Sequence, residues 1–201
     1  MRLPSVIRIL TAVAVVAVAA PATHSAPERT VRAQTAPATG GLMEDFVANH
    51  GQWTGDVKFA ARRGGVAVAL EPHAIRMSLD RDAGARLGFV FEDANRDVTL
   101  EGEGRGPTSY NFLDGRDRGL WRLDVPAYER VLYRGLYDGI DVQVREKDER
   151  FEYDLVVSPH TDVRQVIVRV EGATSLAVGD NGELVVGTAA SAMHQTAPLA
   201  F

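Results

Sequence analysis

The segment from Val131 to Val144, VLYRGLYDGIDVQV, holds two tyrosines, two glycines and two aspartates, a density of polar groups typical of an active site. Asp141, near its end, could lie beside Glu152 or Asp154 on the following strand. Two carboxyl groups about 5–9 Å apart are what a glycosidase needs. Carboxylate oxygens are also the ligands that calcium prefers. These three acids are therefore the first candidates for chemistry.

Arginines offer a structural explanation of the same residues. Arg134, Arg145 and Arg150 are interspersed among the acids, and cross-strand charge pairs stabilise a sheet without catalysis. In a strand over 140–145 the apolar side chains share one face, and Asp141 falls on the other. We predict that Asp141 forms an inter-strand salt bridge or accepts a hydrogen bond from turn amides. We assign no catalytic, cofactor-binding or metal-binding residue.

Other motifs of catalysis are missing from the sequence. There is no nucleophile elbow, zinc-peptidase helix or phosphate loop. The run from Gly102 to Pro107 superficially suggests a dinucleotide loop, but the proline breaks its spacing and neighbouring glutamates would repel phosphate, so we interpret it as a strand-ending loop. Lys58 and Lys147, the only lysines, are more typical of solvated side chains. No cofactor is expected.

The histidines are not spaced as metal-binding pairs on a helix or strand. They are His50, His73, His160 and His194, with His24 as well if a leader is cleaved early. His50, which stands in the run Asn49-His-Gly-Gln-Trp53, is the strongest candidate among them.

Aromatic residues leave two interpretations open, a sugar-stacking platform and core packing, of which core packing is favoured. The candidates are Trp53, Trp121, Tyr110, Tyr128, Tyr133 and Tyr137. If one strand runs continuously through Tyr128 and Tyr133, their side chains project to opposite faces.

The elements that must position these residues follow a period of two, in short runs separated by Gly, Asp and Pro. Strands are expected at 56–61, 66–70, 74–79, 86–91, 98–101, 121–125, 130–133, 140–145, 151–157, 166–170, 176–179 and 183–186. A hairpin is expected at 62–65 and another at Asn181-Gly182. Helix is scarce, with a turn or two possible over 43–49. The sequence predicts an all-β fold, an antiparallel β-sandwich of about ten or more short strands.

The N-terminus has a different composition from the rest of the chain. Residues 1–22 combine a basic start with an uncharged Val/Ala-rich run, which predicts a signal peptide, with cleavage as late as residue 33. Residues 23–41, rich in Pro, Ala and Thr, predict a disordered linker, and 42–201 a β-sandwich domain. No later stretch is long and apolar enough for a membrane span. We therefore expect an exported protein that is extracellular, on the cell surface or in the periplasm.

The charge of the chain and its lack of cysteine exclude some binding partners and some kinds of site. The chain has 22 basic and 27 acidic side chains, a net charge of −5, and no cysteine. Such an acidic surface argues against nucleic acid and anionic membranes. Without cysteine there are no disulfides or thiolate metal sites.

Ordered motifs give the chain a family resemblance over about residues 44–201. They are Phe46-Val-Ala-Asn49-His-Gly51-Gln52-Trp53, Tyr110-Asn111-Phe112-Leu113, Trp121, Val125-Pro126-Ala-Tyr128, Val131 to Asp141, Glu152-Tyr153-Asp154, Gly182-Glu-Leu184 and Gln195-Thr-Ala-Pro198. In these the chain resembles the N-terminal domain of unknown function that precedes β-propeller-type SBBP repeats in secreted bacterial proteins. Asp138 stands where that pattern has proline, and the sequence stops at Phe201, where such proteins continue into repeats. The chain is thus expected to be either truncated or a stand-alone copy.

The resemblance implies a β-rich module of a secreted or cell-surface protein and no established activity. We expect a non-catalytic structural or interaction domain whose partners are downstream β-propeller repeats or an extracellular polymer. The alternative is a carbohydrate-binding or carbohydrate-acting, glycosidase-like secreted protein.

Overall fold

A computed structural model describes residues 43–63, 65–79, 85–147, 150–189 and 191–200. The expected signal peptide and linker lie outside these residues. Within them the fold is antiparallel and almost entirely β, as predicted. No helix in the described ranges is long and apolar enough to cross a membrane.

Thirteen strands and two single turns of 3-10 helix make up the described chain. In order they are β1 (Met43–Ala48), β2 (Phe59–Arg63), β3 (Val66–Glu71), β4 (Ala74–Leu79), β5 (Ala85–Glu92), β6 (Thr99–Phe112), η1 (Arg118–Leu120), β7 (Arg122–Tyr137), β8 (Ile140–Lys147), β9 (Arg150–Val157), η2 (Val163–Gln165), β10 (Ile167–Glu171), β11 (Ser175–Val178), β12 (Leu184–Gly187) and β13 (Ala192–Gln195).

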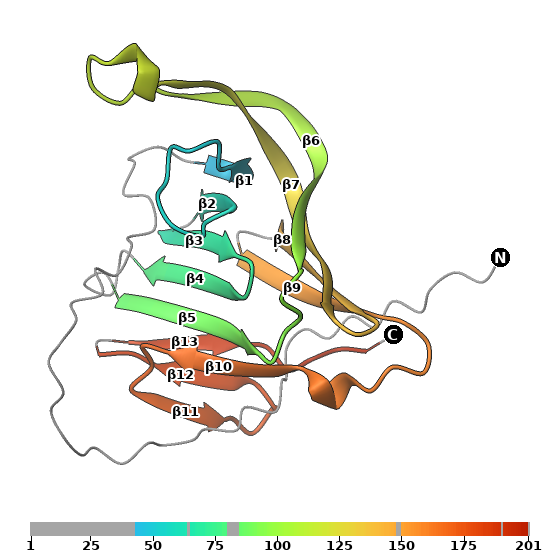
Figure 1. The fold of residues 1–201 in the computed structure, drawn as a ribbon. Helices are drawn as coiled ribbons and strands as arrows, with labels where there is room; N and C mark the ends of the chain where they lie inside the picture. Colours follow the sequence, from blue (N-terminus) through green and yellow to red (C-terminus); the bar gives the residue numbers. More distant parts are fainter. Residues whose placement is uncertain (1–42, 64, 80–84, 148–149, 190, 201) are drawn as a thin grey trace, which may run out of the picture.

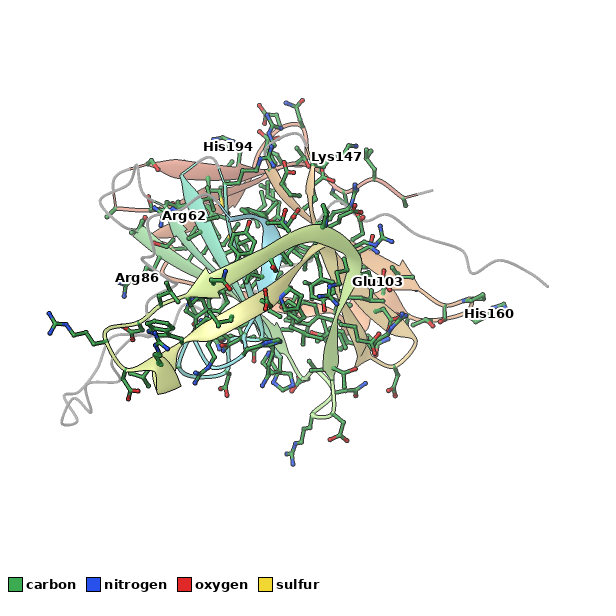
Figure 2. The ribbon with its side chains drawn as sticks, turned by 90° about the horizontal axis from the view of Figure 1, so that it is seen from above. Arg62, Arg86, Glu103, Lys147, His160 and His194 are labelled. Atoms are coloured by element: carbon green, nitrogen blue, oxygen red, sulfur yellow. The ribbon has the colours of Figure 1, made fainter. Side chains whose placement is uncertain are left out.

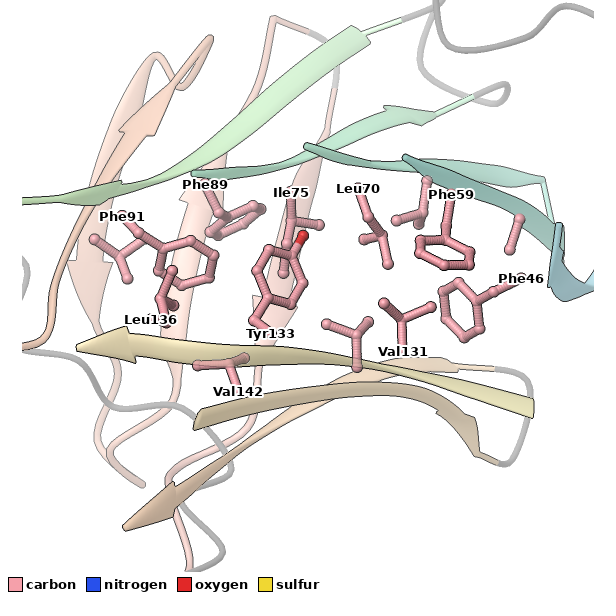
Figure 3. Packing of buried hydrophobic residues seen from close by; sticks show 14 of the residues in the cluster. Phe46, Phe59, Leu70, Ile75, Phe89, Phe91, Val131, Tyr133, Leu136 and Val142 are labelled. Atoms are coloured by element: carbon pink, nitrogen blue, oxygen red, sulfur yellow. The ribbon is translucent and has the colours of Figure 1, made fainter. Parts of the chain in front are cut away.

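The main sheet is one continuous curled surface with the order β10-β5-β4-β3-β2-β1-β7-β8-β9, and β6 pairs with β7 beside this path. It curls until β2–β5 face β7 and β8 across the core (Figure 3). The shape is a half-barrel rather than the clear sandwich that we predicted. The reason is β1, which pairs with β2 on one side and β7 on the other, so that the sheet bends there instead of dividing into two.

Apolar side chains from both halves of the curl meet in a single core (Figure 3). Phe59, Leu70 and Phe89 enter it from β2, β3 and β5, while Val131 and Tyr133 enter it from β7. Tyr133 is fully buried, and its hydroxyl donates to the carbonyl oxygen of Ala74 across the core at 3.3 Å. This bond satisfies the one polar atom that its ring brings inside.

A second, three-stranded sheet of β11, β12 and β13 lies beside β10 (Figure 1). Val186 at its centre is fully buried and belongs to the main core cluster, against which Leu176, Leu184 and Met193 also pack. Gln195 donates to the Tyr153 hydroxyl of β9 at 3.2 Å. Because β9 and β10 are the two ends of the curled sheet, the small sheet contributes to closing the core between them.

Strands β6 and β7 form a long hairpin, here called the arm, that extends beyond the body and ends in η1 (Figure 1). Seen from above, it crosses over the body, and Glu103 lies on it (Figure 2). Its register shifts twice, between Arg105 and Ser109 and between Tyr110 and Phe112. Such bulges bend and twist a strand pair, which is how the arm curves away from the sheet.

Several local predictions have clear outcomes. The hairpin at 62–65 joins β2 to β3, and the hairpin at Asn181-Gly182 joins β11 to β12. In the second, Gly182 has φ 77°, whereas Asn181 has an ordinary negative φ. The expectation of a helical turn over 43–49 is wrong: β1 spans most of it, because Phe46 and Val47 are buried between two paired strands. Sheet packing here overrides the local helix preference.

Candidate functional site

Asp141 holds together a bulge in β7. Between Tyr133 and Tyr137 the register with β8 shifts, and Gly135 within this bulge has φ 61°. The Gly135 N–H donates to Asp141 Oδ1 at 2.7 Å, and Arg134 Nη1 lies 3.3 Å from Asp141 Oδ2. The predicted inter-strand salt bridge is therefore confirmed. The hydrogen bond comes from an amide in the β7 bulge and not from the turn at Asp138-Gly139.

Glu152 and Asp154 share one arginine. Arg145 Nη2 lies 2.9 Å from Glu152 Oε2, and Arg145 Nε lies 3.0 Å from Asp154 Oδ2. Asp154 is 3 % exposed, although strand alternation places it on the outer face. Asp141 is directly opposite Val156 in the β8–β9 register, so neither acid is its direct cross-strand partner. Each of the three candidate carboxylates thus contacts a guanidinium, which removes the main argument for a glycosidase pair at these residues.

Ion pairs continue from this face onto the base of the arm. Arg134 Nε donates to Glu101 at 3.1 Å, and this bond is the largest cause of a raised pKa for Arg134. Arg130 and Arg134 both contact Glu103, at 3.0 and 3.3 Å. The arrangement ties β6, β7 and β8 together side by side, which is the cross-strand pairing expected from the sequence.

The buried tyrosines are not bases at neutral pH. Burial raises the pKa of Tyr133 well above its ordinary value. Burial also raises the pKa of Tyr137 to about 12, although its hydroxyl hydrogen-bonds to backbone oxygens of Glu92 and Ile167. Both phenols therefore stay protonated and act as hydrogen-bond donors that fix strands.

The Asn49–Trp53 motif is a structural loop. The Asn49 side-chain nitrogen donates to the carbonyls of Trp53 and Val57 at 2.9 and 2.7 Å, while its oxygen accepts from the N–H groups of Gly51 and Trp53. The His50 carbonyl accepts from Arg122 Nε at 2.9 Å. The motif thus ties the segment after β1 to the arm, and its histidine contributes through its backbone.

The other histidines do not come together. His160 and His194 lie on separate parts of the molecule (Figure 2), and His73 Nε2 is 3.0 Å from the Asn95 carbonyl. In the part of the chain that the structure describes, no three His, Asp or Glu side chains are grouped to hold a metal ion. Lys58 and Lys147 are both exposed.

The six candidate aromatic residues are buried or half-buried. Trp53 packs edge-on against Phe112 at 5.5 Å, and the Trp121 ring lies 5.3 Å from the Arg118 guanidinium carbon. Tyr128 and Tyr133 contact core phenylalanines Phe59 and Phe91, each at 5.9 Å. Our expectation that these two tyrosines face opposite sides is wrong. They lie on one continuous strand, β7, and both rings contact core phenylalanines, so both are on the core side of that strand.

The glycine-rich run at 102–107 lies inside β6 and is not a strand-ending loop. A Cβ on Gly102 would lie 2.4 Å from the ring of Tyr128. The glycine is therefore required because the aromatic ring covers its backbone, as glycine in a strand often indicates.

The arm tip carries a surface that the sequence analysis missed. Leu113, Leu120 and Leu123 are 59 %, 51 % and 56 % exposed, half of the strongly exposed large apolar side chains in the described residues. Leu113 directly follows β6, and Leu120 and Trp121 directly precede β7, so these residues belong to the connection between the two strands. Leu123 and Asp124 form a bulge there, with φ 53° at Asp124 and its N–H bonded to Asn111 Oδ1 at 2.9 Å. The signal that could have revealed the patch is three leucines within a segment otherwise rich in Asp, Arg and Gly.

These features define an antiparallel half-barrel with a projecting arm, ion-paired on its outer face. The chain belongs to a family described as a domain of unknown function, DUF7948, whose model matches residues 46–201. No curated protein and no solved structure matches the chain.

Proposed function

We propose that this protein is an exported, non-catalytic structural or interaction module of a bacterial secreted or cell-surface protein, and that the arm tip is its contact surface. The observation that carries the proposal is the strong exposure of Leu113, Leu120 and Leu123, here called the leucine patch, at the end of a hairpin that extends from the body. Exposed apolar clusters on soluble proteins mark interaction sites.

Hydrogen bonds at the arm tip fix the backbone that carries the exposed leucines. Asp117 caps η1 by accepting from the Gly119 N–H at 2.9 Å, and Arg122 Nη1 donates to the carbonyls of Gly119 and Trp121. The tip is thus held in one shape by polar bonds while its apolar side chains face outward. A preorganised surface loses less entropy when it binds.

The proposed occupant is a β-propeller-type repeat unit of the same polypeptide, which the family resemblance suggests. Three leucines and part of a tryptophan are far less than the roughly 800 Å² per partner that a stable free complex buries. A contact this small needs a tether, because a linked partner is present at an effective concentration in the millimolar range. The size of the patch therefore favours a linked unit over a second free copy.

A repeat polypeptide fused after residue 201 tests this occupant. Hydrogen exchange over 110–125 is expected to slow in the fusion relative to the chain alone. Leu113→Ser with Leu123→Ser should abolish that protection, whereas Val178→Ser, at a valine outside the arm that is even more exposed, should leave it intact. Unchanged exchange in the fusion would overturn the proposed occupant. Protection by an added extracellular polysaccharide instead would assign the arm to polymer binding.

Export is tested separately with residues 1–41 fused to a reporter that is active only outside the cytoplasm. We expect activity from that fusion and none after Arg2→Glu with Arg8→Glu, since a signal peptide needs its basic start. Reporter activity that is absent from the unmodified fusion would contradict export while leaving the arm proposal standing.

A further inference from the structure

We propose that Asn181 is a deamidation site whose reaction is controlled by the hydrogen bonds of the β11–β12 turn. Asn181 is exposed and is followed by Gly182, the neighbour that least obstructs attack of its backbone nitrogen on the asparagine side chain. The dipeptide lies at the hairpin whose strand β12 contributes Val186 to the core.

The reaction needs only water. The Gly182 backbone nitrogen loses its proton and attacks Asn181 Cγ, a C–N bond forms, and the side-chain nitrogen leaves as ammonia. Water then opens the resulting five-membered imide at either of its carbonyls. One opening gives aspartate, and the other gives isoaspartate, in which the main chain runs through the former side chain.

The folded turn restrains the first step. The Gly182 N–H donates to the Gly179 carbonyl at 2.9 Å, so the proton of the attacking nitrogen is held in a backbone hydrogen bond. The Gly179 N–H in turn donates to the Glu183 carbonyl at 2.8 Å, and the Asn181 N–H lies 3.2 Å from Glu183 Oε2. The hairpin must open before Gly182 can react, which makes the rate a measure of local opening.

The product would weaken the same hairpin. A carboxylate at position 181 would stand between Asp180 and Glu183, and it would repel the Glu183 carboxylate that now accepts from the Asn181 backbone. An isoaspartate would lengthen the main chain inside a turn that Gly182 completes at φ 77°. Because β12 packs into the core, either change would loosen the small sheet.

Peptide mapping by mass spectrometry of the full chain tests the proposal. Samples are incubated in mildly alkaline buffer, folded or in urea, and the conversion of Asn181 is followed beside Asn49, Asn95 and Asn111 as internal controls. We expect Asn181 to convert first among the four in urea, and at least about tenfold more slowly in the folded chain. Asn181→Gln should remove the signal, and Asn181→Asp should increase hydrogen exchange in β11 and β12.

Two results would overturn the proposal. If Asn181 converts equally fast in the folded and unfolded chains, the turn does not control the reaction. If it converts no faster than the three control asparagines in urea, position 181 is not a preferred deamidation site.

Discussion

Asp154 places a carboxylate on the outer side of the sheet and yet is almost closed to water. Its side chain is 4 % exposed, and Arg145 and Glu152 beside it are each 16 % exposed. Strand alternation correctly predicts that Asp154 points away from the apolar face. It could not predict the burial. Arg145 and Glu152 lie on β8 and β9, and the pairing register of these two strands cannot be derived from the local sequence pattern.

Replacing Arg145 by Met should lower the free energy of unfolding by about 3 kcal/mol, because the buried Asp154 carboxylate would lose the guanidinium that lies 3.0 Å from it. Arg164→Met is the control, since its pair with Asp162 is 87 % and 57 % exposed, and a pair so open to water contributes little to stability. Urea denaturation measures both. Equal losses in the two variants would show that the Arg145 pair contributes no more than a surface pair.

At the scale of elements, the arm depends on close packing between β6 and β7 at Gly102. An added methyl group cannot fit beside the Tyr128 ring without displacing it, and Tyr128 also contacts Phe59 of the core. The glycine-rich run is visible in the sequence, but its structural role is not. No local sequence pattern shows that the Tyr128 ring lies over Gly102.

Gly102→Ala should therefore destabilise the protein by about 1–3 kcal/mol, as overpacking does. Gly106→Ala in the same strand is a matched control, because its Cβ would come no closer than 3.4 Å to another atom, Asp45 Oδ2. Thermal unfolding followed by circular dichroism compares the two. A Gly106 variant that is as unstable as the Gly102 variant would mean that β6 simply does not tolerate alanine.

A second set of ion pairs attaches β10 to the sheet through Glu171, which bonds to both Arg76 and Arg169. Burial alone would raise the pKa of Glu171, but the hydrogen bonds from Arg169 and Arg76 lower it below its ordinary value. A carboxylate whose pKa is lowered in the folded state stabilises the protein at pH values above the pKa that the same group has in the unfolded chain. That stabilisation is lost as the pH falls through the folded pKa.

Glu171→Gln should accordingly be less stable than the unmodified chain at neutral pH, and its stability should fall less steeply on acidification. The measurement is the free energy of unfolding at a series of pH values from neutral to about 3. Glu129→Gln, at an exposed position on the arm, provides the comparison. Identical pH profiles for Glu171→Gln and the unmodified chain would remove Glu171 from the acid response.

For the whole molecule, the all-β class, most strands and two hairpins could be predicted from the period-two pattern. The curl could not, since it arises from β1 pairing with both β2 and β7. The small sheet also has a role that no local pattern shows: β12 delivers Val186 into the core of the main sheet.

Val186→Ala should cost about 2 kcal/mol by leaving a cavity in the core. Val178→Ala, at a residue 75 % exposed, should change stability by less than about 0.5 kcal/mol. Unfolding followed by fluorescence and by circular dichroism should give coincident transitions if the two sheets unfold together. A separate early transition would show that the small sheet is an independent unit.

The sheet order also determines when the chain can complete its fold. Phe46 pairs with Tyr128, and Phe91 pairs with Val168, partners that are separated by more than seventy residues. The meander from β1 to β5 needs only neighbouring strands, so it can form early, whereas the outer edges of β1 and β5 must wait for the distant strands β7 and β10. Chains with such high contact order fold slowly. During that delay the unpaired edges of β1 and β5 are exposed to pairing with other chains, so the yield of folded protein should fall as its concentration during refolding rises.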